Sequence, residues 1–432
     1  MDSQGKKSRK PCLEECNFDG LSPLPDNVLH HILSFIDCLD VVRTCVLSKR
    51  WRNVWKSVPC LNFDISAFTE HNRYSEFEYE PELELELEPE PESETESESE
   101  SESKPLVPCY KFWDFIKWVL LLRDESRIRR INLTFDHTMR QQLNALLCFA
   151  GRKKVQELCF RDGDYTNEGL NFPSEVCETL ESLTIEFHDN ISLRVAKAFS
   201  SLKRLFLSGV VMSGDAAEKF FSRDCVELED VHLEDIRVKD VDIINISADK
   251  LKNLKISNIY RREHYVVVNS FYPKLNICAP NLVSFSYLGP MLHGFSILDT
   301  VSLQHVSIRI SHIPKPRVEG SEDLSPFTKC LVGLKHAKTL TLSSHVVKQF
   351  SPTYFYPLGF TFILDNLKII MLGVRGNVDC IEGLINLLKV SPNLESLVIK
   401  FHEVCRFSKP KKQPSRGIVL TRHFQYFNLE RV

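Results

Sequence analysis

The feature that most constrains the fold of this 432-residue chain is a short apolar motif that recurs from residue 128 onward. The motif has the form LxxLxL and is clearest as LESLTIEF (180–187), LKRLFLSG (202–209) and LEDVHLED (228–235). Alternating apolar and polar residues over so short a stretch are typical of a strand with one buried face. Successive copies begin 21 to 34 residues apart, at Ile128, Val155, Leu180, Leu202, Leu228, Leu251, Leu282, Leu303, Ala337, Leu367 and Leu394.

A unit of this length cannot bury its apolar face alone, so neighbouring units must stack into one continuous core. The pattern therefore predicts an α/β solenoid, in which a curved parallel sheet has helices or irregular segments on its convex side. The period and motif resemble those of leucine-rich repeats. The Asn that usually follows the strand in that family is replaced by Val210, Ile236 and Ile259, so an apolar turn is expected there. The three longest gaps between copies should hold insertions on loops.

The residues between the inward positions of each motif should project from the concave face. One expected layer of outward residues is Arg130, Glu157, Ser182, Arg204, Asp230, Asn253, Ser284 and His305. Charges of both signs alternate in this layer, which favours a protein ligand over an anionic metabolite. In the middle of the face we predict a target-binding group of Arg204, Phe206, Asp230 and His232, with an apolar centre and a polar surround. The open alternative is that Phe206 leans onto the neighbouring repeat and only packs the sheet.

Residues 20–60 carry a helical pattern instead. Pro25 suits a first helical position, and Asp37 and Ser48 are expected to cap two further helices. The first helix should carry one apolar stripe, made of Val28, Leu29, Ile32, Leu33 and Ile36. Three short helices cannot bury so many large apolar groups, so some of them should face a partner.

This segment resembles the F-box. The runs Leu24-Pro25-Asp26, Ile32-Leu33-Ser34 and Val46-Leu47-Ser48-Lys49-Arg50-Trp51 fall where that motif places them. The resemblance implies docking to a Skp-type adaptor and, through it, to a cullin ubiquitin ligase. By matching positions, the expected adaptor-binding residues are Leu24, Pro25, Leu29, Ile32, Leu33, Val46, Leu47 and Trp51. For Trp55 two roles stay open, core filling and adaptor contact.

An F-box followed by irregular leucine-rich repeats, with the amphipathic segment FWDFIKWVLLLR (112–123) ahead of the first strand, resembles the plant F-box/leucine-rich-repeat family. Leu61, Phe63 and Ile65 are expected to form a strand that caps the array. The expected organisation is a basic tail (1–19), the F-box (20–60), a cap strand or linker (61–75), an acidic insert (76–104), the repeat array (105–405) and a basic C-terminal tail (406–432).

The acidic insert is the strongest compositional departure in the chain. Residues 76–103 hold 14 Glu and no basic residue. The whole chain has 54 Lys and Arg against 58 Asp and Glu, so without these 14 Glu its net charge would be +10. Alternation continues through the insert, but a row of like charges opposes strand pairing, and Pro81, Pro89 and Pro91 lack amide donors. Without an apolar face to offset its ordering entropy, the segment is predicted to be disordered.

Several other classes of protein are disfavoured. No apolar stretch follows the basic N-terminal residues, and the most apolar segment (113–122) is half a membrane span, so a soluble intracellular protein is expected. The 14 Cys include no CxxC pair and are expected to be mostly buried thiols. With no HExxH, GxSxG or GxxxxGK[ST] motif, we predict no catalytic residue, metal or cofactor.

The basic clusters 6–10 and 409–412 lack interleaved aromatic residues, which disfavours nucleic-acid binding. Clusters of this kind also resemble nuclear import signals, so the expected location is the nucleus, the cytoplasm or both.

Taken with these features, the resemblance to the F-box/leucine-rich-repeat family implies a non-catalytic substrate receptor of a cullin-type ubiquitin ligase. The F-box would dock the adaptor, and the repeats would bind a target protein. Two alternatives stay open: a small-molecule sensor whose repeats form a ligand pocket, and an F-box scaffold that acts outside ubiquitination.

Overall fold

The computed structural model describes residues 21, 23–68, 109–135, 140–162, 169–261, 272–292, 294–298, 300–311, 333–351, 363–374, 378–401 and 417–421. The N-terminal tail, the acidic insert and most of the C-terminal tail, all predicted from the sequence, lie outside these residues. The predicted loop insertions also fall largely outside them, because residues 262–271, 312–332 and 352–362 belong to the three longest gaps between motifs.

The described part of the chain begins with a small helical unit that confirms the predicted three-helix pattern. Asp37 caps the second helix as expected, because its carboxylate accepts a hydrogen bond from Leu39 N at 2.7 Å. Pro25 is the N-cap residue of the first helix rather than its first member, and Arg50 rather than Ser48 precedes the third. The elements are α1 (Asp26–Leu33), α2 (Cys38–Arg43), η1 (Thr44–Val46), α3 (Trp51–Val54) and η2 (Trp55–Ser57).

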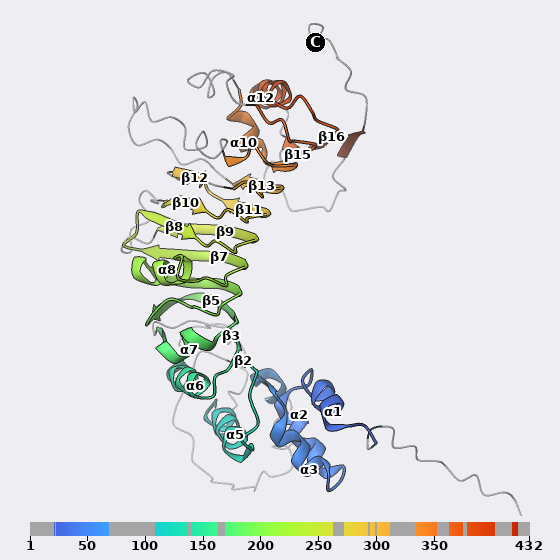
Figure 1. The fold of residues 1–432 in the computed structure, drawn as a ribbon, viewed down its shortest axis with the longest axis vertical. Helices are drawn as coiled ribbons and strands as arrows, with labels where there is room; N and C mark the ends of the chain where they lie inside the picture. Colours follow the sequence, from blue (N-terminus) through green and yellow to red (C-terminus); the bar gives the residue numbers. More distant parts are fainter. Residues whose placement is uncertain are drawn as a thin grey trace, which may run out of the picture.

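The rest of the described chain is organised around a 14-stranded sheet whose strands stack along the long axis of the molecule (Figure 1). Neighbouring strands pair in parallel from β1 to β16, and β17 pairs antiparallel with β16 inside the predicted C-terminal tail. The strands are β1 (Cys60–Asp64), β2 (Arg130–Phe135), β3 (Glu157–Asp162), β4 (Leu170–Phe172), β5 (Ser182–Val195), β6 (Arg204–Ser213), β7 (Asp230–Lys239), β9 (Asn253–Arg261), β11 (Ser284–Gly289), β13 (His305–Ile310), β14 (Thr339–Leu342), β15 (Ile369–Val374), β16 (Ser396–Phe401) and β17 (Gly417–Thr421).

The repeat motif and this sheet coincide. Each predicted copy of LxxLxL forms one strand of the series from β2 to β16, and its inward residues, such as Leu183 and Ile185, are fully buried. The strand register places Arg130, Glu157, Ser182 and Arg204 side by side, and the row continues to His305, as the predicted layer requires.

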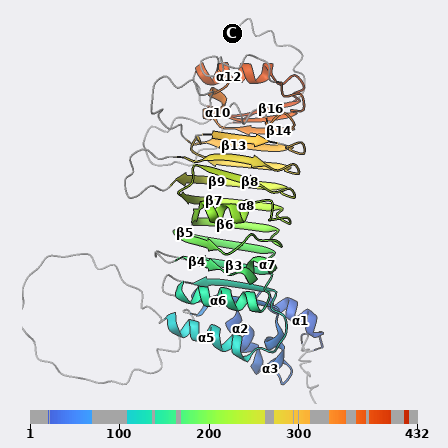
Figure 2. The same cartoon turned by 60° about the vertical axis from the view of Figure 1, so that its left-hand side comes forward.

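The convex side carries both helices and a second sheet. The helices are α5 (Cys109–Leu122), α6 (Arg140–Arg152), α7 (Ser174–Thr179), α8 (Gly214–Phe221), α10 (Ser344–Lys348) and α12 (Val378–Lys389). In the middle of the array β8 (Ile243–Ser247), β10 (Lys274–Cys278) and β12 (Gly294–Leu298) form a three-stranded parallel sheet instead. Figure 2 shows α5 and α6 running across the first repeats on this side. Within the described part of the chain, no helix is both long and apolar enough to cross a membrane.

The turn after the central motifs is apolar, as predicted. Val210, Ile236 and Ile259 are buried. The residue before each of them is left-handed, with φ of +64° at Gly209, 49° at Asp235 and 56° at Asn258. Asp and Asn tolerate this region better than most side chains. Asn258 Nδ2 also donates to Asp235 Oδ1 at 2.9 Å, so a short polar ladder accompanies the apolar turn.

The helical unit and the repeats share one sheet. Leu61 and Phe63 of β1 are buried and pair in register with β2, which confirms the predicted cap strand, whereas Ile65 falls in the helical turn that follows. Asn62 Nδ2 donates to the carbonyls of Ser34 at 2.8 Å and Ile36 at 3.0 Å. Asn62 Oδ1 in turn accepts from Asn132 Nδ2 of β2 at 2.7 Å, so one side chain joins the first helices to the array.

Candidate adaptor-docking and target-binding surfaces

The helical unit presents large apolar side chains to solvent. Val46, Phe35 and Leu47 are 82%, 75% and 61% exposed, and more than a third of the surface of Val28 and Ile32 is accessible. Apolar groups exposed on this scale mark an interaction site. We call these five residues the docking surface.

Helical periodicity explains why two of these five residues are exposed. Leu29 and Leu33 lie on the face of α1 that packs into the core and are buried. Val28 and Ile32, one position earlier in each turn, therefore point toward solvent. An eight-residue helix that packs on one side only cannot bury both pairs.

Arg50 holds the start of α1 in place. Its guanidinium pairs with the Asp26 carboxylate, and Arg50 Nη2 also donates to Leu24 O at 2.5 Å. The hydrogen bond from Arg50 holds the pKa of Asp26 below its usual value. The SKRW part of the motif thus orients the LPD part, although the two are separated by more than 20 residues.

The burial pattern corrects the expected adaptor-binding set in part. Leu29, Leu33 and Trp51 are buried in the helical unit, so they support the docking surface from behind rather than lie on it. Pro25, Ile32, Val46 and Leu47 are exposed and Leu24 is half-buried. Their contact with an adaptor stays a prediction. Sequence reasoning missed Phe35, although its spacing of three from Ile32 and seven from Val28 matches the exposed face.

The four residues predicted to bind a target lie together. Arg204, Phe206, Asp230 and His232 line one hollow of about 420 Å³ on the concave face, which we call the central hollow. They stand on adjacent strands, with Arg204 in register with Asp230 and Phe206 in register with His232. The Phe206 and His232 rings meet edge to face with centroids 4.6 Å apart. Phe206 therefore does lean onto the neighbouring repeat, yet both rings stay only half-buried; target binding here remains a prediction.

The His232 imidazole has an unusual environment. Its Nε2 atom is buried, makes no hydrogen bond and lies 3.5 Å from Glu234 Oε2. Burial lowers the pKa of His232, the Lys255 ammonium lowers it further, and Glu234 opposes both. The neutral imidazole is therefore favoured at neutral pH.

A second hollow of about 590 Å³ lies farther along the same strands. Phe206 lines both hollows, so together they form one trough across β5, β6, β7 and β9. The second hollow is rich in charge, since Glu186, Glu234, Asp235 and Arg237 line it. The trough thus offers an apolar centre with polar and charged ends.

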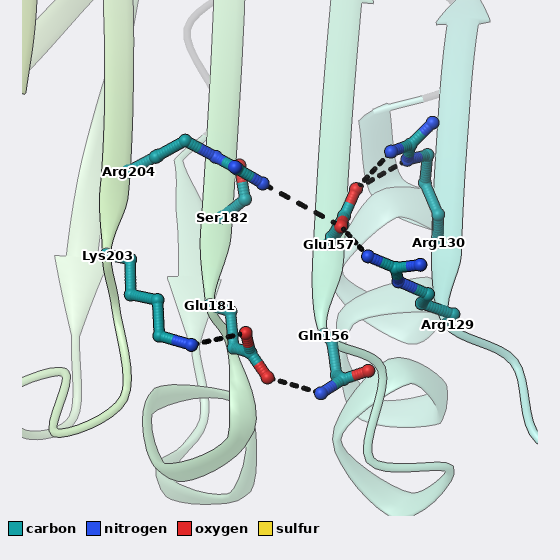
Figure 3. Close-up of polar contacts among 8 residues, drawn as sticks. All are labelled: Arg129, Arg130, Gln156, Glu157, Glu181, Ser182, Lys203 and Arg204. Atoms are coloured by element: carbon teal, nitrogen blue, oxygen red, sulfur yellow. Dashed lines mark hydrogen bonds and ion pairs between the residues drawn. The ribbon is translucent and has the colours of Figure 1, made fainter. Parts of the chain in front are cut away.

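Beside the central hollow, three arginines surround one carboxylate (Figure 3). Arg130 Nε and Nη2 each lie 2.5 Å from Glu157 Oε2, and Arg129 Nη2 lies 3.2 Å from Glu157 Oε1. Arg204 Nη2 reaches to 3.7 Å from the same Oε1 atom across β5. The hydrogen bond that Arg130 donates to Glu157 raises the pKa of Arg130. We call Arg129, Arg130 and Arg204 the arginine cluster.

The described residues hold no group of three or more His, Cys, Asp or Glu that could bind a metal. The described cysteines are free thiols, and burial raises the pKa of several of them, including Cys60 and Cys159 near the arginine cluster. Both surfaces instead present exposed apolar side chains or a mixture of apolar and charged ones.

The structure thus defines a class of protein in which a small helical unit with an exposed apolar surface is joined through β1 to a leucine-rich solenoid. Comparison with known proteins agrees with this architecture. Residues 21–63 match the F-box domain family, and residues 123–423 match the leucine-rich-repeat family described as "At1g61320/AtMIF1, LRR domain".

Curated relatives come from Arabidopsis thaliana. The chain is 26% identical to the F-box/LRR-repeat protein At4g14103 over 419 residues, which is 91% of this chain and 97% of the relative. It is 24% identical to the F-box/FBD/LRR-repeat protein At1g78750 over 420 residues, which is 92% of this chain and 80% of the relative. A shorter match links it to the FBD-associated F-box protein At1g66310. The two are 43% identical over 77 residues, which is 18% of this chain and 17% of the relative. The chain belongs to the plant-type F-box/leucine-rich-repeat family.

Proposed function

We propose that this protein is a non-catalytic substrate receptor of an SCF-type ubiquitin ligase. The docking surface binds a Skp-type adaptor and through it a cullin, while the concave face of the repeats binds a target protein. The observation that carries the proposal is the pairing of β1 with β2, which joins the docking surface and the concave face through one sheet. A target held on the repeats therefore keeps a defined position relative to the ligase.

The mechanism is a gain in effective concentration. A bound target presents its lysines to the ubiquitin-carrying enzyme at a far higher local concentration than a free target does. Because the array is a packed solenoid, the distance and direction from the docking surface to the target vary little.

The test is reconstitution. The full chain should co-elute with a Skp-type adaptor and a cullin, and the complex should transfer ubiquitin to a captured target. A Val46→Asp, Leu47→Asp variant should lose the adaptor and the transfer. An Arg204→Glu, Phe206→Ala variant should keep the adaptor but lose the target. Adaptor binding that persists in the first variant, in a folded protein, would refute docking through this surface.

We further propose that the protein works in the nucleus, the cytoplasm or both, on the support of the basic cluster 6–10. A fluorescent fusion in which those lysines and arginine are replaced by glutamine should lose any nuclear signal that the parent fusion has. An unchanged nuclear signal would remove the cluster as an import sequence.

A further inference from the structure

The arginine cluster carries more positive charge than the fold requires. Glu157 is only 8% exposed, so its carboxylate needs a cation nearby. The two contacts from Arg130 already meet that need. Arg129 and Arg204 add two further cations, which leaves three positive charges against one negative charge.

The three guanidinium groups remain available to a ligand. The side chains of Arg129, Arg130 and Arg204 are 61%, 40% and 59% exposed. Arg204 reaches across β5 to Glu157, and the residue that lies between them on β5 is Ser182. The small Ser182 hydroxyl accepts a hydrogen bond from Arg204 Nε at 3.5 Å. Apart from Glu157 and Ser182, these guanidinium groups have no hydrogen-bond acceptor among the described residues.

The surroundings of the arginine cluster leave room above it. Cys60 lies beside Arg130, and the concave-face side chains one layer further along the strands are small and uncharged: Asn62, Asn132, Cys159 and Thr184. On the opposite side of the arginine cluster, Glu181 is paired with Lys203 at 2.9 Å, so this pair adds no net charge (Figure 3). The nearest acidic residue in the same layer on the other side of Arg204 is Asp230, and its carboxylate accepts from Asn253 Nδ2 at 2.5 Å. Asp230 lies on β7, whereas the Arg204 guanidinium extends in the opposite direction, across β5 toward Glu157 (Figure 3).

We propose that the arginine cluster seats a phosphorylated side chain of the target, while the central hollow takes an apolar side chain of the same segment. The proposal rests on the proposed function and specifies its substrate class. A phosphate carries about −1.5 to −2 charges and three acceptor oxygens, which matches the surplus of two positive charges and the forked donors of arginine. A carboxylate would leave one of the two charges unbalanced.

Geometry also predicts the spacing in the target. Glu157 on β3 and Phe206 on β6 are two inter-strand spacings apart, at about 4.8 Å each, and two residues along the strand add about 7 Å. The combined distance of about 12 Å corresponds to three or four residues of an extended peptide. An apolar or aromatic side chain should therefore lie three or four positions from the phosphorylated residue.

The test uses the full chain bound to its adaptor and three degenerate 12-residue peptide libraries. Their central residue is phosphoserine, serine or glutamate. The phosphoserine library should be retained at least about tenfold more than either of the others, the size of one charge-assisted contact. Retained peptides should be enriched in apolar residues at three or four positions from the centre. Equal retention of phosphoserine and serine, equal retention of phosphoserine and glutamate, or no retention, would each overturn the proposal.

Matched variants locate the site. Arg204→Gln should lower phosphopeptide retention about tenfold or more, and Arg204→Lys, which keeps the charge but not the fork, should give an intermediate loss. Both leave Arg129 and Arg130 beside Glu157, so the melting temperature should be unchanged. Arg161→Gln removes the same charge from the same face, but Arg161 is paired one-to-one with Glu186 and should retain the phosphopeptides. An equal loss in Arg161→Gln would show general electrostatic attraction and overturn the site. Adaptor binding measured in parallel separates this outcome from failure of the proposed function.

Discussion

The indole of Trp118 stacks on the indole of Trp55, with ring centroids 5.7 Å apart and planes inclined by 10°. Trp55 belongs to the F-box and Trp118 to α5, the helix that precedes the first repeat. Trp55 is buried, so its role is core filling, one of the two that its position in the motif left open. Arg123, which directly follows α5, adds a hydrogen bond from Nη1 to Val58 O at 2.7 Å. The F-box and the repeats therefore share a core as well as a sheet.

Replacing Trp55 should destabilise the whole chain. Trp55→Ala removes a buried ring at the junction and should lower the free energy of unfolding by about 3–5 kcal/mol. Trp118→Ala should cost less, because the Trp118 ring is partly exposed. Denaturant unfolding followed by circular dichroism measures both. Two separate transitions in the parent protein, with Trp55→Ala moving only the weaker one, would show that the F-box folds independently of the repeats.

The docking surface and its buried support should respond in opposite ways. Val46→Ala with Leu47→Ala should weaken adaptor binding about tenfold or more and leave the melting temperature unchanged, since both side chains are exposed. Leu33→Ala should instead lower the free energy of unfolding by about 2–5 kcal/mol, because it opens a cavity in the helical unit. Calorimetry of binding and of unfolding separates the two effects. Val226→Ala, at an exposed valine in the repeats, is the control and should change neither.

Gly209 should not tolerate a side chain. Its φ is +64°, and a Cβ at this position would lie 1.9 Å from Phe187 O, a backbone atom of the neighbouring strand. Gly209→Ala should therefore lower the free energy of unfolding by more than about 2 kcal/mol. Gly214→Ala is the matched control, because its Cβ would meet only the Val241 side chain, at 3.1 Å, and the backbone is ordinary. Similar melting temperatures for the two variants would contradict the close packing of β5 and β6.

His232 should make stability depend on pH. Its pKa in the folded state lies below the ordinary value of 6.5, so the unfolded chain takes up a proton more readily. The neutral His232 imidazole makes its full contribution to the free energy of unfolding above pH 6.5. That contribution is lost as the pH falls through 6.5 toward the lower pKa of the folded state. His232→Gln should therefore show a smaller loss of unfolding free energy than the parent between pH 7.5 and 5.5, by urea unfolding. An unchanged pH dependence would mean that the imidazole is not held neutral by its burial.

The repeat architecture was predictable because it depends on local periodicity. Each LxxLxL copy determines which side chains of its own strand turn inward, and a strand of this kind can be buried only beside another copy. The predicted layer from Arg130 to His305 followed directly, as did the grouping of Arg204, Phe206, Asp230 and His232. The convex sheet of β8, β10 and β12 was missed, although residues 243–247 and 274–278 show the same alternation, because those stretches lie between the motifs.

What the amino-acid sequence determined by itself was therefore the strand register, the concave layer and the presence of the F-box. Only the tertiary structure decided which apolar F-box residues face solvent. Leu29 and Val28 are adjacent and equally apolar, and the packing of α1 on α3 buries one and exposes the other. The arginine cluster likewise exists only in the folded chain. Arg129, Glu157 and Arg204 are far apart in sequence, and they meet because stacked repeats bring equivalent positions to within a side chain's length.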